Sequence, residues 1–240
     1  MLRYNELKTK SREFLASTGL KRDEFEQLLP AFRAAYEKKY PPERTQEGTP
    51  RQRQFGGGAK GALPEIEDKL FFILVYHKTH PLQTMQGLHF GMSQPQANCW
   101  IHRLLAVLQH ALRDLGEAPE RDARRVAGSP LALAGSPNLQ VDGTERRRQR
   151  PQDDAQQKEH YSGKKKAHTD KNILVVNANT KKVVYLSPTI AGKTHDKKAT
   201  DEAQVAYPTN ATLDKDTGFQ GYEPAATLTT QPKKSRKAKS

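Results

Sequence analysis

The sequence of 240 residues lacks the features of secreted and membrane-spanning proteins. It contains a single cysteine, Cys99, so no disulfide bond can form within the chain. No apolar run reaches the roughly 18 residues that a membrane-spanning helix needs, and the N-terminal residues lack the apolar core of a signal peptide. We therefore expect a cytoplasmic protein without a membrane partner.

Apolar and acidic residues are also scarce. Hydrophobic residues make up 35% of the chain, which is little for a well-filled core and predicts long polar connections. The 40 lysines and arginines outnumber the 27 acidic residues and give a formal net charge of +13. This excess indicates a polyanionic partner, most simply nucleic acid, although a basic structural protein would show the same balance.

The N-terminal residues have the apolar spacing of helices. Residues 3–39 are predicted to form two helices, broken at Thr18-Gly19, and residues 1–40 are interpreted as a helical hairpin without chemistry. Residues 41–64 contain consecutive prolines and glycines together with several basic residues. We interpret this segment as a basic linker, either solvated or ordering on DNA.

Residues 65–117 show the pattern of a helix-turn-helix domain. After a strongly apolar first helix, a short helix is predicted over residues 82–89, followed by a turn containing Gly91. Ser93 is a favourable N-cap for a third helix that continues to Leu115. A short helix, a glycine turn and a longer helix are typical of this DNA-binding motif.

Four polar residues of the third helix are candidates for DNA contacts. Gln94 lies in its first turn, and Gln96, His102 and Arg103 fall outside the apolar stripe. Glutamine can pair with adenine edges and arginine with guanine edges in the major groove. An ordinary solvated helix face is the alternative interpretation.

Strand patterns begin at Leu139, after a polar segment, residues 118–138, that we interpret as a connection between domains. Two β-branched runs, residues 172–178 and 182–190, are predicted to form strands joined by a turn. A short helix over residues 195–207 and a final strand over 211–214 are expected to follow. This pattern indicates an α/β arrangement.

Two aspartates close to glycines stand out in this part of the chain. Asp142 precedes Gly143 after a short apolar run, and Asp216 precedes Gly218 after another. Two such carboxylates at strand ends could converge on a divalent metal ion. Each could equally be an ordinary turn residue.

Four segments complete a recognisable set of motifs. They are Glu145–Pro151, Tyr161–Thr169, Gly192–Lys198 and Asp216–Tyr222. In this order, and over nearly the whole chain, the set resembles the transposases of small bacterial insertion sequences, in the Harbinger-related branch of the DDE superfamily. The resemblance implies an α+β fold class, with an N-terminal all-α helix-turn-helix domain followed by an incomplete ribonuclease-H-like α/β catalytic domain at residues 139–240.

The resemblance also implies roles for individual residues. Asp142 and Asp216 correspond to the first two acidic residues, which would be catalytic and hold Mg²⁺ or Mn²⁺; Asp214 fits less well, because only Asp216 is followed by one residue, a glycine and an aromatic residue. Six further residues match the family's motifs and would hold phosphate or shape the site. The alternative is that they are surface lysines and a helix-capping His-Asp pair. They are Lys164, Lys165, Glu145, His168, His195 and Asp196.

The implied activity is metal-dependent cleavage and strand transfer of double-stranded DNA, at the terminal repeats of the element and at the target, near the bacterial nucleoid. A homo-oligomer is compatible with it. The family's third acidic residue, a glutamate, has no counterpart, because Glu223 follows Asp216 too closely. We therefore expect a truncated chain that is inactive alone. The alternative is a catalytically dead remnant that only recognises element ends.

Overall fold

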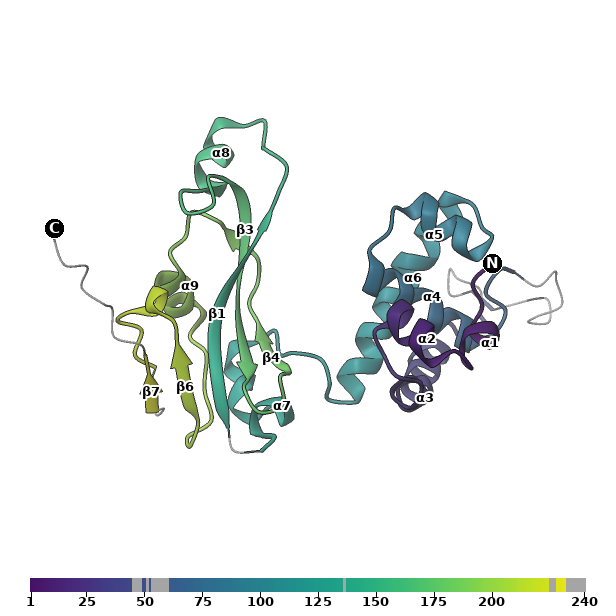
Figure 1. Ribbon diagram of the computed structural model, residues 1–240, viewed down its shortest axis with the longest axis horizontal. Coiled ribbons are helices and arrows are strands. Elements are labelled where there is room, and N and C mark those ends of the chain that lie inside the picture. The colour runs from purple at the N-terminus through teal and green to yellow at the C-terminus, as the bar shows by residue number, and fades with distance from the viewer. Residues whose placement is uncertain (45–48, 51, 53–60, 136, 225–227, 232–240) are drawn as a thin grey trace. The chain divides into compact units, whose positions relative to one another are not determined.

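The chain divides into two compact units, Met1–Glu117 and Ala118–Ser240, which we call the helical unit and the sheet unit (Figure 1). The computed structural model describes residues 1–44, 49–50, 52, 61–135, 137–224 and 228–231. Most of the glycines and basic residues of the expected linker lie outside these ranges. Within the described ranges, no helix is both long and apolar enough to cross a membrane.

Six helices make up the described part of the helical unit. They are α1 (Tyr4–Leu7), α2 (Ser11–Thr18), α3 (Arg22–Lys39), α4 (Ile66–Thr79), α5 (Gln83–Phe90) and α6 (Gln94–Asp114). The expected break at Gly19 is confirmed, because this residue ends α2 with a φ of 76°. Where two helices were expected before residue 40 there are three, since the short α1 precedes them.

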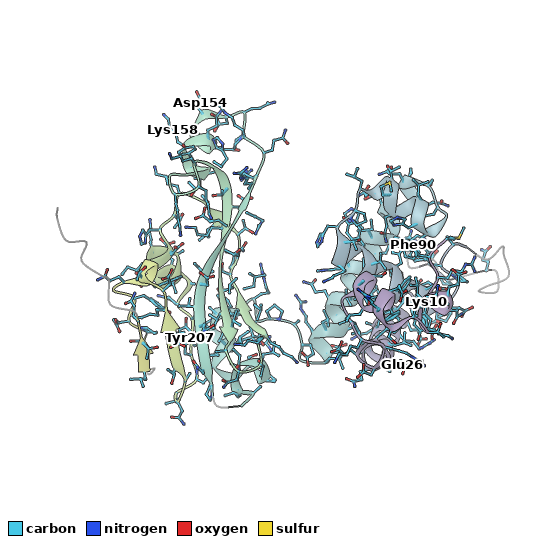
Figure 2. The ribbon with its side chains drawn as sticks, in the orientation of Figure 1. Lys10, Glu26, Phe90, Asp154, Lys158 and Tyr207 are labelled. Atoms are coloured by element: carbon cyan, nitrogen blue, oxygen red, sulfur yellow. The ribbon has the colours of Figure 1, made fainter. Side chains whose placement is uncertain are left out.

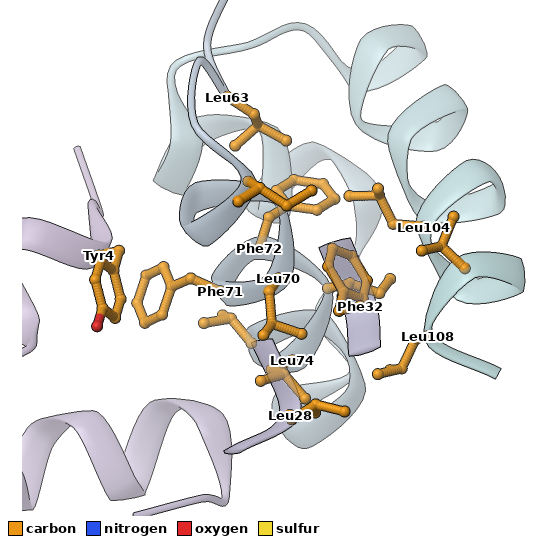
Figure 3. Close-up of a cluster of buried hydrophobic side chains, with 14 of the residues drawn as sticks. Tyr4, Leu28, Phe32, Leu63, Leu70, Phe71, Phe72, Leu74, Leu104 and Leu108 are labelled. Carbon is orange, nitrogen blue, oxygen red and sulfur yellow. The ribbon is translucent and has the colours of Figure 1, made fainter. Parts of the chain in front are cut away.

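The core of the helical unit is built around α4, whose residues from Leu70 to Val75 are all buried. Aromatic rings fill much of this core, as the close-up shows (Figure 3). Phe71 stacks on Phe14 of α2 at 5.9 Å between ring centroids, and Phe72 meets Phe90 of α5 edge-on at 4.8 Å. The expected hairpin and the expected helix-turn-helix therefore share one core.

In the sheet unit, the described residues form seven strands and several short helices. Its elements are η1 (Ala123–Gly128), α7 (Pro130–Leu133), β1 (Asn138–Arg147), α8 (Asp154–His160), β2 (Tyr161–Ser162), β3 (Ala167–Asn177), β4 (Val183–Leu186), β5 (Ile190–Ala191), α9 (Asp196–Ala203), β6 (Thr212–Lys215), η2 (Thr217–Phe219) and β7 (Leu228–Thr230).

The sheet is mixed, with the strand order β2-β3-β1-β6-β7 and with β4 and β5 also paired to β3. The β1–β3 and β3–β4 pairs are antiparallel, and β6 lies parallel to β1. The expected meander, helix and strand are thus present, and the α+β class with a ribonuclease-H-like arrangement is confirmed. β7, parallel to β6, was not expected from the sequence.

The two faces of the sheet differ in burial. Along β1, Leu139 and Val141 are buried, whereas Gln140 and Asp142 are exposed, as the alternation of a strand requires. The buried face packs against η1, α7 and α9. Residues 118–138 contribute Val126, Leu131 and Ala132 to this core, although their polar composition suggested only a connection.

Candidate functional site

The turn between α5 and α6 is built by glycines and a cap. Gly91 ends α5 with a φ of 66°. Ser93 and Gln96 form a capping box, in which the Ser93 backbone N–H donates to Gln96 Oε1 at 3.0 Å. Gly87 is required for space, because a Cβ there would lie 2.5 Å from the Met92 carbonyl oxygen. Its role was not recognised from the sequence, where it lies inside a helical pattern.

The four candidate DNA-binding residues of α6 have different environments. Gln94 is exposed and donates from Nε2 to Gln83 Oε1 at 2.5 Å, and Gln96 is exposed but engaged in the capping box. His102 is exposed and lies further along the helix. Arg103 is half-buried, with its guanidinium 5.6 Å from the ring centroid of Trp100. The first three residues are therefore accessible to a ligand, and Arg103 is only partly so.

The parallel pairing of β1 with β6 brings the two candidate metal ligands together. The register pairs Gln140 with Asp214 and Val141 with Lys215. The next residues along both segments are Asp142 and Asp216, which therefore lie side by side on the face that carries Gln140 and Asp214. Both aspartates are exposed.

Local hydrogen bonds orient the two carboxylates. Asp142 Oδ1 accepts from the Gly143 backbone N–H at 2.7 Å, and Asp216 Oδ1 accepts from the Thr217 N–H at 2.6 Å. In both residues Oδ1 is the oxygen that accepts, and within the described ranges Oδ2 remains available to a ligand. Two exposed carboxylates suit a hard cation such as Mg²⁺, which keeps several of its waters. Among the described residues, no group of three or more His, Cys, Asp or Glu side chains is placed to hold a metal ion.

A buried charged cluster lies on the opposite face of the sheet. Lys171 Nζ on β3 contacts Asp196 Oδ1 at 2.7 Å and Glu145 Oε1 at 3.3 Å, and it donates to the Thr194 carbonyl oxygen at 2.7 Å. Glu145 and Lys171 are cross-strand partners, as their register shows. The sequence analysis named Glu145 and Asp196 but missed the lysine that joins them.

The environment of Glu145 changes the acidity of its carboxyl group. Burial by itself raises the pKa of Glu145, but hydrogen bonds from Ser162, Lys171 and Thr169 and the charge of Lys171 outweigh burial. The net pKa therefore lies below its ordinary value, and the carboxylate stays ionised next to Lys171.

The two histidines of the predicted site are not gathered at the aspartates. His195 is the N-cap of α9, with Nδ1 accepting from the Lys197 N–H at 3.3 Å, which supports the capping interpretation. His168 packs edge-on against Tyr161 at 5.6 Å. Since Asp142 pairs with Leu174, His168 lies about 20 Å further along the sheet at the usual rise per residue.

Lys164 and Lys165 are exposed in the turn between β2 and β3, at the same far end of the β1–β3 ribbon as His168. Figure 2 shows Asp154 and Lys158 of α8 at this end and Tyr207 in the body of the unit. Asp170 holds the ribbon end together, because it contacts Arg148 at 3.0 Å and His160 at 3.1 Å. The two lysines thus present positive charge away from the aspartates.

Comparison with known proteins finds two families along the chain. Residues 61–114, which include α4, α5 and α6, match the helix-turn-helix of DDE superfamily endonucleases. Residues 141–239 match the DDE superfamily endonuclease itself, and they include both aspartates. No curated protein and no solved structure matches the chain.

Proposed function

Because the chain belongs to the DDE superfamily endonucleases and carries their helix-turn-helix, we propose that it is the transposase of a bacterial insertion sequence. It would act in the cytoplasm at the nucleoid, and its substrates are the terminal repeats of the element and the target DNA. The observation that supports this most directly is the parallel register that sets Asp142 beside Asp216 on an exposed face.

In this proposal the two units divide the work. Within the helical unit, residues 65–117 bind element ends, with Gln94, Gln96 and His102 facing the DNA and Arg103 at the margin. Residues 139–240 are the catalytic domain, in which Lys164 and Lys165 attract phosphate groups. The net charge of +13 supports a polyanionic substrate.

Asp142 and Asp216 are the residues that would hold Mg²⁺ or Mn²⁺. The bound metal would supply activation of an attacking hydroxyl and stabilisation of the leaving oxygen during phosphodiester cleavage. Aspartates with an ordinary pKa near 4 are ionised at neutral pH and offer the hard oxygen ligands that such ions prefer. The open face around them leaves room for a DNA backbone.

A second function is favoured by the number of carboxylates. Among the described residues, no group of three or more His, Cys, Asp or Glu side chains is placed to hold a metal ion, whereas two-metal cleavage draws on more negative charge than two aspartates supply. Glu223 contacts Lys215 at 3.2 Å, and the Lys215 side chain is buried on the face opposite to Asp216. We therefore propose that this 240-residue chain does not transpose DNA by itself and binds element ends without cleaving them.

The metal proposal is tested by titration of the full chain with Mn²⁺. We expect Asp142→Asn and Asp216→Asn each to weaken binding strongly, because each removes one negative ligand. The matched control is Asp214→Asn, which removes a carboxylate from the same face two residues earlier. Equal affinity in all four proteins would show that the two aspartates are ordinary surface residues.

A cleavage assay on element-end DNA with Mg²⁺ or Mn²⁺ separates the two functions. Specific binding without cleavage supports the second function, and clean end-specific cleavage supports the first. If the chain cleaves element ends, Glu223→Gln becomes the next variant, since Glu223 would then be the third acidic residue by elimination.

The DNA proposal is tested by salt titration of binding. Affinity should fall steeply with salt, by a slope of about −0.9 per neutralised phosphate on a double-logarithmic plot. We expect His102→Ala and Arg103→Ala to weaken binding to element ends more than Arg113→Ala, which alters the last turn of the same helix. Absence of binding at low salt would contradict the proposal.

A further inference from the structure

Two glycines of the sheet unit follow the two aspartates, and both touch the same side chain. Gly143 comes directly after Asp142, and Gly218 comes two residues after Asp216. A Cβ added to Gly143 would lie 2.9 Å from Asp196 Oδ1, and one added to Gly218 would lie 3.3 Å from Asp196 Oδ2. One carboxylate thus packs against both backbone segments.

The backbone conformation does not explain why glycine occupies these positions. Gly143 lies within β1 rather than at the turn that its sequence context suggested, and neither Gly143 nor Gly218 has a positive φ. Residues with side chains adopt such conformations readily. At Gly143 the Asp196 carboxylate occupies the space that a Cβ would fill, and at Gly218 it leaves only a tight fit for one.

Asp196 is itself fixed on several sides. It is the first residue of α9, and Lys171 Nζ donates to its Oδ1 at 2.7 Å. The same ammonium group donates to the Thr194 carbonyl oxygen at 2.7 Å, immediately before α9. The Thr200 hydroxyl donates to the Asp196 carbonyl oxygen at 2.8 Å. The carboxylate therefore ties α9 and β3 to the segments that carry the two aspartates.

Asp196 contacts the covered side of the sheet, opposite to the side that Asp142 faces. Gly143 faces the covered side together with Val141 and Glu145, whereas Asp142 faces the exposed side. Asp196 thus lies on the side of the sheet opposite to the two proposed metal ligands, and it contacts the backbone of the segments that carry them. A ligand pair works only within about 0.5 Å of its productive geometry, so a contact that sets both segments at once controls their spacing.

We propose that Asp196 is a positioning residue: its carboxylate, held by Lys171, fits against Gly143 and Gly218 and sets the separation of Asp142 and Asp216. This inference rests on the proposed function, in which those two aspartates hold the divalent metal ion. It assigns to α9 the task of aligning two segments that are far apart in the sequence.

The test is Mn²⁺ titration of the full-length chain, with circular dichroism to establish that each variant is folded. Asp196→Ala should weaken Mn²⁺ binding by about tenfold or more, the size typical for residues that support metal ligands. Asp196→Asn keeps the volume and should weaken binding less. Gly143→Ala and Gly218→Ala should also weaken it, with the larger effect at Gly143, where the contact is closer.

Two controls match these changes. Asp201→Asn removes an exposed carboxylate from the same helix, so it carries the same change of charge without the contact to the glycines. Gly163→Ala adds a methyl group where nothing lies within 4 Å. Both should bind Mn²⁺ within about twofold of the unaltered chain.

A double variant tests the contact itself. In Gly143→Ala/Asp196→Ala the carboxylate that clashes with the new methyl group is gone, so its Mn²⁺ affinity should equal that of Asp196→Ala alone. Additive losses would mean that the two residues act independently, and the inference would be wrong. The double variant also decides the matter if one single variant fails to fold.

The possible outcomes distinguish the positioning role of Asp196 from the proposal that Asp142 and Asp216 hold the metal ion. If Asp142→Asn abolishes Mn²⁺ binding while Asp196→Ala leaves it unchanged, the positioning role is wrong and the metal proposal stands. If the unaltered chain binds no more Mn²⁺ than Asp142→Asn does, both are overturned. Loss in both variants, with intact controls, supports the inference.

Discussion

Among the described residues, the helical unit buries Lys69 and the sheet unit buries Lys171 and Lys215. Lys69 and Lys171 are stabilised in different ways. Lys69 of the helical unit donates to the carbonyl oxygens of residues 63, 64 and 65 and lies near the rings of Tyr36 and Trp100. Burial lowers its pKa. Lys171 of the sheet unit is held by the carboxylates of Glu145 and Asp196. The first lysine fastens the chain at the start of α4; the second belongs to a charged cluster that reaches the proposed site.

The cores of the two units also differ in composition. The helical unit fills its centre with phenylalanines, and its proposed DNA-binding residues lie on the outer surface of α6. Among the described residues, the sheet unit buries more polar side chains than the helical unit does, among them Ser162, Thr169 and Asn172. Stability and function should therefore be separable in the helical unit and coupled in the sheet unit.

The largest expected effect comes from the aromatic core. Phe71→Ala should destabilise the helical unit by about 3–5 kcal/mol, because the fully buried ring leaves a cavity. Trp100, the only tryptophan, reports on this unit by fluorescence during urea unfolding. Leu82→Ala is the control, since Leu82 is 78% exposed and its truncation should cost within about 0.5 kcal/mol. An unfolding midpoint that Phe71→Ala left unchanged would contradict this prediction.

Neutralising Lys69 and neutralising Lys171 should lower the free energy of unfolding by different amounts. Lys171→Met leaves the buried Glu145 carboxylate and the half-buried Asp196 carboxylate without their partner and should cost about 3–5 kcal/mol. Lys69→Met leaves carbonyl oxygens without a donor and should cost less, about 1–3 kcal/mol. Urea unfolding followed by circular dichroism measures both. The comparison fails if Lys69→Met proves the more destabilising of the two.

The smallest expected effect is a dependence on pH confined to the sheet unit. The pKa of Glu145 in the folded chain lies below the value of about 4.3 expected when unfolded. Its ionised form therefore stabilises the fold above pH ~4.3, and this contribution is lost as the pH falls through the lowered pKa. The difference in stability between the unaltered chain and Glu145→Gln should shrink on acidification, whereas Trp100 fluorescence should show no matching change. A difference independent of pH would contradict this account.

Local features could be predicted from the sequence because short-range physics decides them. The helix that begins after Ser93 follows from an N-cap, a capping partner three residues later and a helical stripe, all within one segment. The end of α2 at Gly19 follows from a single residue's conformational freedom. The mixed order of strands, by contrast, was implied only by the family resemblance.

Other features escaped because their signals are weak or distant. Residues 118–138 are polar on average, so the burial of Val126 and Leu131 was hidden until the sheet was there to cover them. His168 and the two lysines at 164 and 165 belong to the expected motifs, yet the length of the β1–β3 ribbon carries them away from the aspartates.

The sequence by itself determined the helical nature of the N-terminal unit and the positive charge, and it singled out Asp142 and Asp216 as candidate metal ligands. Only the tertiary structure decided that β6 pairs with β1 in the register that sets Asp142 beside Asp216. It also decided that Asp196 lies against Gly143 and Gly218. Pairing between distant strands depends on how the whole sheet covers its core, and no local pattern of residues encodes that choice.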